Sequence, residues 1–174
     1  MKFLIKIISF PLSILQLFFF GLTLLLFDLF QRINFNLFGY AAHKKTVDFM
    51  SYFLILTLQF IGGSIKYRSK YKLPKNVPLI IVSNHQGLFD IPPIGWFFIN
   101  HHPKYVSKIE LENGIPGISY NLKHGGSVLI NRKDAKQSLL AISNFGKYIE
   151  QNNFAAVIFP EGTRSKDGRL LPFK

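Results

Sequence analysis

The 174-residue sequence contains no cysteine, which excludes a disulfide framework, a thiolate metal site and a cysteine nucleophile. Acidic residues are scarce, with nine Asp and Glu against 21 Lys and Arg, so the formal net charge is +12. Charged residues make up only 17% of the chain, below the roughly 25% of an average soluble domain. Hydrophobic residues make up 48%, and this content excludes an intrinsically disordered chain.

The apolar residues are concentrated at the N-terminus, where 12 of the 19 Phe lie before residue 66. An uncharged run of 21 residues, Ile7–Phe27, would form a helix of about 31 Å, enough to cross a hydrocarbon core. A second uncharged run, Phe49–Ile65, has 17 residues and is near the shortest length that can span. Basic residues flank both runs, so the positive-inside rule gives no orientation. Two full spans and a hairpin that dips into one leaflet both fit this pattern.

Two other structures fit the same runs. A secretory signal peptide would explain Lys2 and Lys6, although the first run is long for that role and no small-residue cleavage site closely follows it. Two buried helices of a soluble protein would also be apolar. We expect a membrane-associated two-helix segment over residues 1–65 and an α/β domain over residues 66–174.

Five basic residues follow the second run within ten positions and without an acidic residue: Lys66, Arg68, Lys70, Lys72 and Lys75. Such a cluster beside a membrane segment attracts anionic lipid or an anionic substrate. The alternation of basic and other residues also fits a strand with one basic face. In that case the lysines would only discourage pairing at a sheet edge.

Short apolar runs alternate with helical patterns in the rest of the chain. This order predicts an α/β fold with a mixed, largely parallel open sheet flanked by helices. The expected strands cover 77–83, 104–110, 127–131 and 155–159. The first is a continuous apolar run, as in a strand buried on both faces.

Two helices are expected between these strands. One covers 115–124 and is closed by Gly125-Gly126, and the other follows Asp134, a suitable N-cap, and extends to about Asn152. The second has apolar residues at helical spacing on one face, which are Ala135, Leu139, Ile142, Phe145 and Ile149.

Three of the expected strands run directly into polar residues. His85 and Asp90 follow the first strand, Arg132 follows the third, and residues 161–164 (Glu-Gly-Thr-Arg) follow the fourth. If these strands are parallel, the motifs meet at one edge of the sheet, where open α/β folds bind ligands.

These residue types indicate a particular chemistry. Histidine is the usual general base for a hydroxyl, and Asp90 would fix the tautomer of His85. The motifs supply no obvious nucleophile, so the attacking hydroxyl is expected to belong to the substrate. Two arginines and a Gly-Thr turn suit a phosphate on that substrate.

Spacing alone does not establish the His85–Asp90 pair, because His43 and Asp48 have the same five-residue offset with no strand ahead of them. Each motif residue also has an ordinary explanation: Asp90 as a helix N-cap, and Arg132 as a solvated charge. The convergence of the three motifs carries the hypothesis.

The three motifs resemble those of the glycerolipid acyltransferases of the 1-acyl-glycerol-3-phosphate acyltransferase family. Residues 84–90 (Asn-His-Gln-Gly-Leu-Phe-Asp) resemble the first motif of that family, and 126–132 (Gly-Ser-Val-Leu-Ile-Asn-Arg) resemble the second. Residues 159–165 (Phe-Pro-Glu-Gly-Thr-Arg-Ser) match the third motif at every position. The resemblance covers roughly residues 66–174, and three motifs in the right order make it specific.

The resemblance implies acyl transfer from acyl-CoA or acyl-carrier protein to the free hydroxyl of lysophosphatidate, giving phosphatidate. It assigns catalysis to His85 and Asp90. It assigns substrate binding to Arg132, Glu161, Gly162, Thr163 and Arg164. No metal or bound cofactor is implied.

The resemblance also implies a location and further partners. A phospholipid membrane is the expected partner, with the catalytic part on the cytoplasmic side, where soluble acyl donors are found. The sequence ends at Lys174, before the fourth motif of the family, so we expect the C-terminal part of the domain to be missing.

Three alternatives stay open at this point. The acceptor would be a different lysophospholipid or lipid in a related acyltransferase. A non-catalytic membrane protein that binds lipid would keep the apolar segment without turnover. Nucleic-acid binding is indicated only by the net charge of +12, and no recognition motif supports it.

Overall fold

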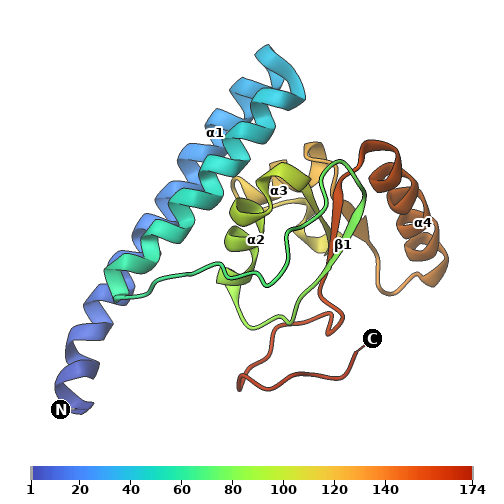
Figure 1. Ribbon diagram of the computed structural model, residues 1–174. Helices are drawn as coiled ribbons and strands as arrows, with labels where there is room; N and C mark the ends of the chain where they lie inside the picture. The colour runs from blue at the N-terminus through green and yellow to red at the C-terminus, as the bar shows by residue number, and fades with distance from the viewer. Residues whose placement is uncertain (1, 174) are drawn as a thin grey trace.

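The computed structural model describes residues 2–173. Its first element, α1 (Lys2–Leu56), is interrupted at Gly39, where φ is 74° and ψ is −166°. The chain reverses direction at this glycine, so α1 is a hairpin of two antiparallel arms (Figure 1). A positive φ is readily adopted by glycine, which lacks a Cβ. The expected two-helix N-terminal segment is confirmed, and its connection is a single kinked residue.

Buried polar side chains hold the two arms of the hairpin together. Gln31 is fully buried, and its Oε1 bonds to His43 Nε2 at 3.1 Å. Gln31 Nε2 donates to Gly117 O at 3.0 Å, which ties the hairpin to the loop before α3. Asp48 pairs instead with Lys44 at 2.6 Å. His43 and Asp48 therefore have different partners and do not form a catalytic pair.

Large apolar side chains cover the outer surface of the hairpin. Phe10, Phe18 and Leu25 are exposed, with values of 70%, 61% and 58%. A helix over residues 8–61 is long and apolar enough to cross a membrane, by length and composition alone. The reversal at Gly39 divides that length between the two arms.

The hairpin ends in the short helix η1 (Thr57–Ile61), which is capped by Gly62 in the left-handed conformation. Residues 64–78 then run without helix or strand. The alternative interpretation of this segment, a strand with one basic face, is wrong. A strand needs a face to bury, whereas every residue from 66 to 75 is exposed and pairs with no strand of the described sheet.

The sheet has four strands in the order β1-β4-β2-β3, and every pair is parallel. The strands are β1 (Leu79–Val82), β2 (Pro103–Lys108), β3 (Val128–Ile130) and β4 (Ala155–Ile158). The longer helices after the hairpin are α2 (Ile91–Phe97), α3 (Ile118–His124) and α4 (Ala135–Asn152). Short helical turns connect them: η2 (Leu88–Asp90), η3 (Ile99–His101) and η4 (Ile109–Glu112). The expected α/β fold is confirmed.

The two faces of the sheet carry different helices (Figure 1). On one face, Ile94 of α2 packs with Tyr105 and Val157, and the hairpin lies outside α2 and α3. On the other, Phe145 and Ile149 of α4 pack with Ala156. Alternate residues of β4 therefore point to opposite faces, as the pleat of a strand requires.

The expectation that the first strand is buried was wrong. β1 is an edge strand, and its Ile80 and Val82 are 71% and 62% exposed because α4 packs on β3 and β4 instead. The first half of α4 is also open, with Leu139 70% exposed, because α4 packs on the sheet through Phe145 and Ile149 near its other end. The N-cap was predicted correctly, since Asp134 Oδ1 accepts from Gln137 N at 2.9 Å.

Candidate active site

His85 and Asp90 meet at the carboxyl end of β1. His85 Nδ1 lies 2.7 Å from Asp90 Oδ2, and the same oxygen accepts from the backbone N–H groups of Gln86 at 2.7 Å and Gly87 at 2.9 Å. Because a carboxylate only accepts, Nδ1 is the nitrogen that donates, and in the neutral ring the lone pair lies on Nε2. The ring of His85 stacks on Phe159, with centroids 4.3 Å apart. Both contacts fix the orientation of the imidazole.

Glu161 lies behind His85 and is fully buried. Its Oε1 accepts from His85 N at 2.7 Å, and its Oε2 accepts from Leu171 N at 2.9 Å. Glu161 is not among the described residues that line the pocket next to His85. The carboxylate therefore joins the loop after β1 to the loop after β4, and it is not placed to meet a substrate phosphate.

The other residues of the second and third motifs lie at the pocket mouth. Arg132 Nη1 donates to Gly162 O, which connects the loops after β3 and β4. Gly162 has a φ of 64°, in the left-handed region that favours glycine. Arg132, Thr163 and Arg164 are exposed and line the pocket together with His85. The parallel sheet thus brings the three motifs to one edge, as the strand order predicts.

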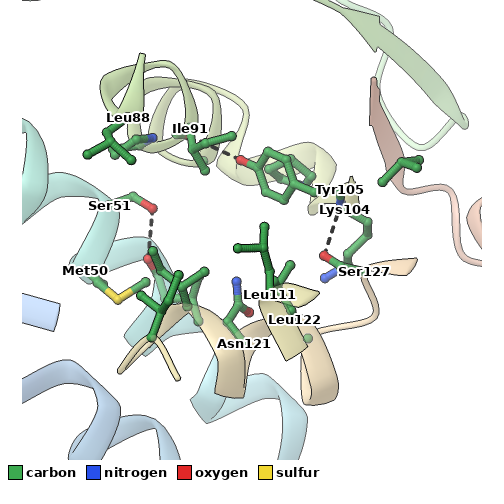
Figure 2. Close-up of a pocket in the computed structure, with 18 of the residues that line it drawn as sticks. Met50, Ser51, Leu88, Ile91, Lys104, Tyr105, Leu111, Asn121, Leu122 and Ser127 are labelled. Atoms are coloured by element: carbon green, nitrogen blue, oxygen red, sulfur yellow. Dashed lines mark hydrogen bonds between the residues drawn. The ribbon is translucent and has the colours of Figure 1, made fainter. Parts of the chain in front are cut away.

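A pocket of about 380 Å³ extends from this edge into the space between the hairpin and β2. Its walls are mostly apolar and come from elements far apart in sequence (Figure 2). They include Phe20, Met50 and Leu54 of the hairpin, Ile91 of α2 and Leu122 of α3. Sequence reasoning missed the contribution of the hairpin, because an apolar helix in sequence gives no signal of which neighbour it will face.

A polar group closes the far side of this pocket. Lys104, at the amino end of β2, is 4% exposed and donates from Nζ to Tyr40 Oη at 2.6 Å. Its Nζ also lies 4.9 Å and 5.0 Å from the ring centroids of Tyr40 and Phe154. Burial, together with the nearby charge of Lys44, lowers the pKa of Lys104 to about 8.

The chemistry of the site does not resemble that of a metal centre. Within residues 2–173, no three His, Asp or Glu side chains converge as metal ligands. The expectation that the site needs neither metal nor bound cofactor stays a prediction. The arrangement instead offers one oriented imidazole, a cationic rim and an apolar cavity beside them.

Comparison with known protein families matches residues 64–174 to the family described as Acyltransferase. The match covers more than half of the chain and includes the three motifs. The chain belongs to the acyltransferase family.

Individual relatives of this chain carry a narrower name. It is 30% identical over 133 residues to human 1-acyl-sn-glycerol-3-phosphate acyltransferase beta, covering 75% of this chain and 47% of the relative. It is 38% identical over 99 residues to the 1-acyl-sn-glycerol-3-phosphate acyltransferase of Helicobacter pylori, covering 55% and 39%. The chain therefore spans less than half the length of these curated relatives.

A solved structure has a similar fold. The 1-acyl-sn-glycerophosphate acyltransferase from Thermotoga maritima superposes with a TM-score of 0.74 at 24% identity, covering 98% of this chain and 67% of that chain. At this identity, the similarity establishes the fold alone. It extends over both the hairpin and the α/β sheet.

Proposed function

We propose that this acyltransferase moves an acyl group from a soluble thioester, acyl-CoA or acyl-carrier protein, to the free hydroxyl of lysophosphatidate, producing phosphatidate. The observation that carries the proposal is the bond between His85 Nδ1 and Asp90 at the mouth of an apolar pocket. The names of the curated relatives support the choice of acceptor.

In this reaction His85 acts as the general base. Its Nε2 takes the proton of the acceptor hydroxyl while the oxygen attacks the thioester carbonyl carbon. The tetrahedral intermediate then collapses, the C–S bond breaks, and the departing sulfur receives the proton from the imidazolium. Asp90 holds the required tautomer and stabilises the positive ring. The chain itself forms no covalent bond with the acyl group.

The surroundings of His85 suit both the phosphate of the acceptor and the hydrocarbon chain of a lipid substrate. Arg132 and Arg164 bring two guanidinium groups to the mouth, where they would bind the phosphate of lysophosphatidate, and Thr163 adds a hydroxyl. Gly162 gives the turn its shape, and Glu161 acts through the backbone of His85. The apolar pocket has the lining and size expected for a hydrocarbon chain.

The hairpin supports a membrane location for the site. Phe20 of its first arm contacts Phe89 of the loop that carries His85, with ring centroids 5.3 Å apart. Phe19, next to Phe20, stacks on Phe60 with ring centroids 4.8 Å apart, so the open end of the hairpin lies near that loop. We infer that a bilayer holds the acceptor at this end while the donor arrives from the cytoplasmic side.

Thiol release from acyl-CoA tests the proposal. Membranes carrying the chain should release thiol only when lysophosphatidate is present, and the His85→Ala variant should lose this release while remaining in the membrane. Transfer by His85→Ala at the normal rate would refute the role of the base. Release that is equal with other lysophospholipids would refute the choice of acceptor.

A further inference from the structure

The segment between the hairpin and β1 is strongly basic and exposed to solvent. Its residues 66–75, here called the basic strip, contain five cations and no acid. All ten residues are exposed. No carboxylate in the described part of the chain forms an ion pair with any of the five cations. These charges therefore contribute little to the stability of the fold.

The protective role that lysines have at sheet edges does not account for the basic strip. That role requires a strand beside the sheet, and the strip is neither a strand nor paired with β1. A run of like charges on an exposed segment costs free energy through repulsion, and here no partner within the described chain offsets it. Its complement is an anionic surface outside the protein.

The position of the basic strip indicates which surface this is. It begins four residues after Gly62, at the end of the hairpin where the exposed Phe60 and Ile61 lie. Tyr67 stacks on Phe97 with ring centroids 5.3 Å apart, which anchors the strip across α2 (Figure 1). Tyr71 is 72% exposed between two lysines. Aromatic rings interleaved with cations suit a membrane interface, where one side is apolar and the other carries charge.

We propose that the basic strip is a docking surface for anionic phospholipid and makes the protein prefer negatively charged bilayers. The apolar hairpin contributes affinity for any bilayer, and the strip adds selection by headgroup charge. This combination of an apolar anchor with a polybasic segment is an effective way to hold a protein at a membrane. Each basic residue close to an anionic bilayer strengthens binding about fivefold. The inference extends the membrane location in the proposed function, but it does not depend on catalysis.

A competition between two vesicle populations tests this preference. The full chain in neutral detergent is diluted into a mixture of phosphatidylcholine vesicles and denser vesicles that also contain about 30% phosphatidylglycerol, at about 0.1 M salt. Both populations accept the hairpin, so the ratio of bound protein reports the effect of headgroup charge. We expect a preference of about tenfold or more for the anionic vesicles, decreasing as salt is added.

A matched pair of variants assigns the preference to the strip. The first variant replaces Lys66, Arg68, Lys70 and Lys72 by Gln. The second replaces four exposed lysines elsewhere by Gln, which are Lys133, Lys136, Lys147 and Lys166. The net charge changes equally in both. The preference of the first variant, which keeps only Lys75 of the five cations, should be at least about fivefold below that of the unmodified chain, and the second variant should keep most of the original value.

The outcomes are decisive in either direction. Equal preference in the first variant and the unmodified chain would overturn the proposal, as would an equal loss in both variants, since net charge alone would then be responsible. Acyl transfer to lysophosphatidate in neutral micelles should be the same in all three proteins and verifies their folding. If none of them transfers acyl groups, the proposed function fails while the vesicle ratios still decide this inference.

Discussion

Glu161 and the backbone of His85 are joined by a hydrogen bond of 2.7 Å inside the protein. The second oxygen of the same carboxylate accepts from Leu171 N at 2.9 Å. A single fully buried side chain thus fixes the loop that carries the proposed base and the segment that follows the third motif. The motif resemblance suggested substrate binding for Glu161, whereas its contacts indicate a positioning residue.

Replacing Glu161 by Gln should therefore lower kcat much more than it raises KM for lysophosphatidate. The amide can accept only one of the two N–H groups, and leaving a buried donor without a partner costs about 1–3 kcal/mol of stability. Kinetics on membranes and thermal unfolding in neutral detergent measure the two effects. A large rise in KM with unchanged kcat would instead indicate direct contact with the acceptor.

Replacing Asp90 by Asn should reduce transfer about 10²- to 10⁴-fold. In the Asp90→Asn variant the amide oxygen would keep the position that accepts from Gln86 N, Gly87 N and His85 Nδ1, so the ring would keep its tautomer but lose the negative charge that stabilises the imidazolium. The rate with saturating donor and acceptor measures this change. Thr163→Ala is the control, because it alters the pocket mouth without touching the histidine, and its loss should be smaller.

Replacing Gly95 by Ala should destabilise the contact between α2 and the second arm of the hairpin. A Cβ at this position would lie 2.6 Å from Ser51 Oγ and 3.3 Å from Ser51 Cβ. We expect a loss of about 1–3 kcal/mol from overpacking. Adding Ser51→Ala removes the shorter contact and should recover part of the loss in the unfolding midpoint. If the double variant recovered no stability, the loss in Gly95→Ala would not come from the contact with Ser51 Oγ.

Lys104 should make stability depend on pH in the alkaline range. Burial, with the charge of Lys44, lowers the pKa of Lys104 to about 8 in the folded state, whereas the pKa of an unfolded lysine is about 10.4. Between these values the unfolded chain binds more protons, so the free energy of unfolding should rise with pH by up to about 1.4 kcal/mol per unit.

Unfolding in neutral detergent from about pH 7.5 to about pH 9.5 measures this slope. The Lys104→Met variant should lack it, because the titrating group is gone. The exposed Lys108, at the other end of β2, provides the control, and Lys108→Met should leave the slope unchanged. A slope that persists in Lys104→Met would assign the titration to another group.

Much of the fold could be predicted from local patterns in the sequence. The apolar runs predicted the hairpin helices, and Asp134 predicted the start of α4, because caps and hydrophobic periodicity act over a few residues. The parallel arrangement predicted that His85, Arg132 and the third motif share one edge. The spacing of His85 and Asp90 could not separate them from His43 and Asp48.

Only the tertiary structure distinguished the two His–Asp pairs and showed which polar residues reach the pocket. His43 is buried against Gln31, whereas His85 opens into a pocket whose wall comes from the hairpin. Glu161 contacts the backbone of His85, although the motif resemblance assigned it to substrate binding, and the basic strip is not a strand. Burial and partners depend on which elements meet across long sequence separations. Residue type and spacing determined the chemistry available to this protein, and packing decided which groups can use it.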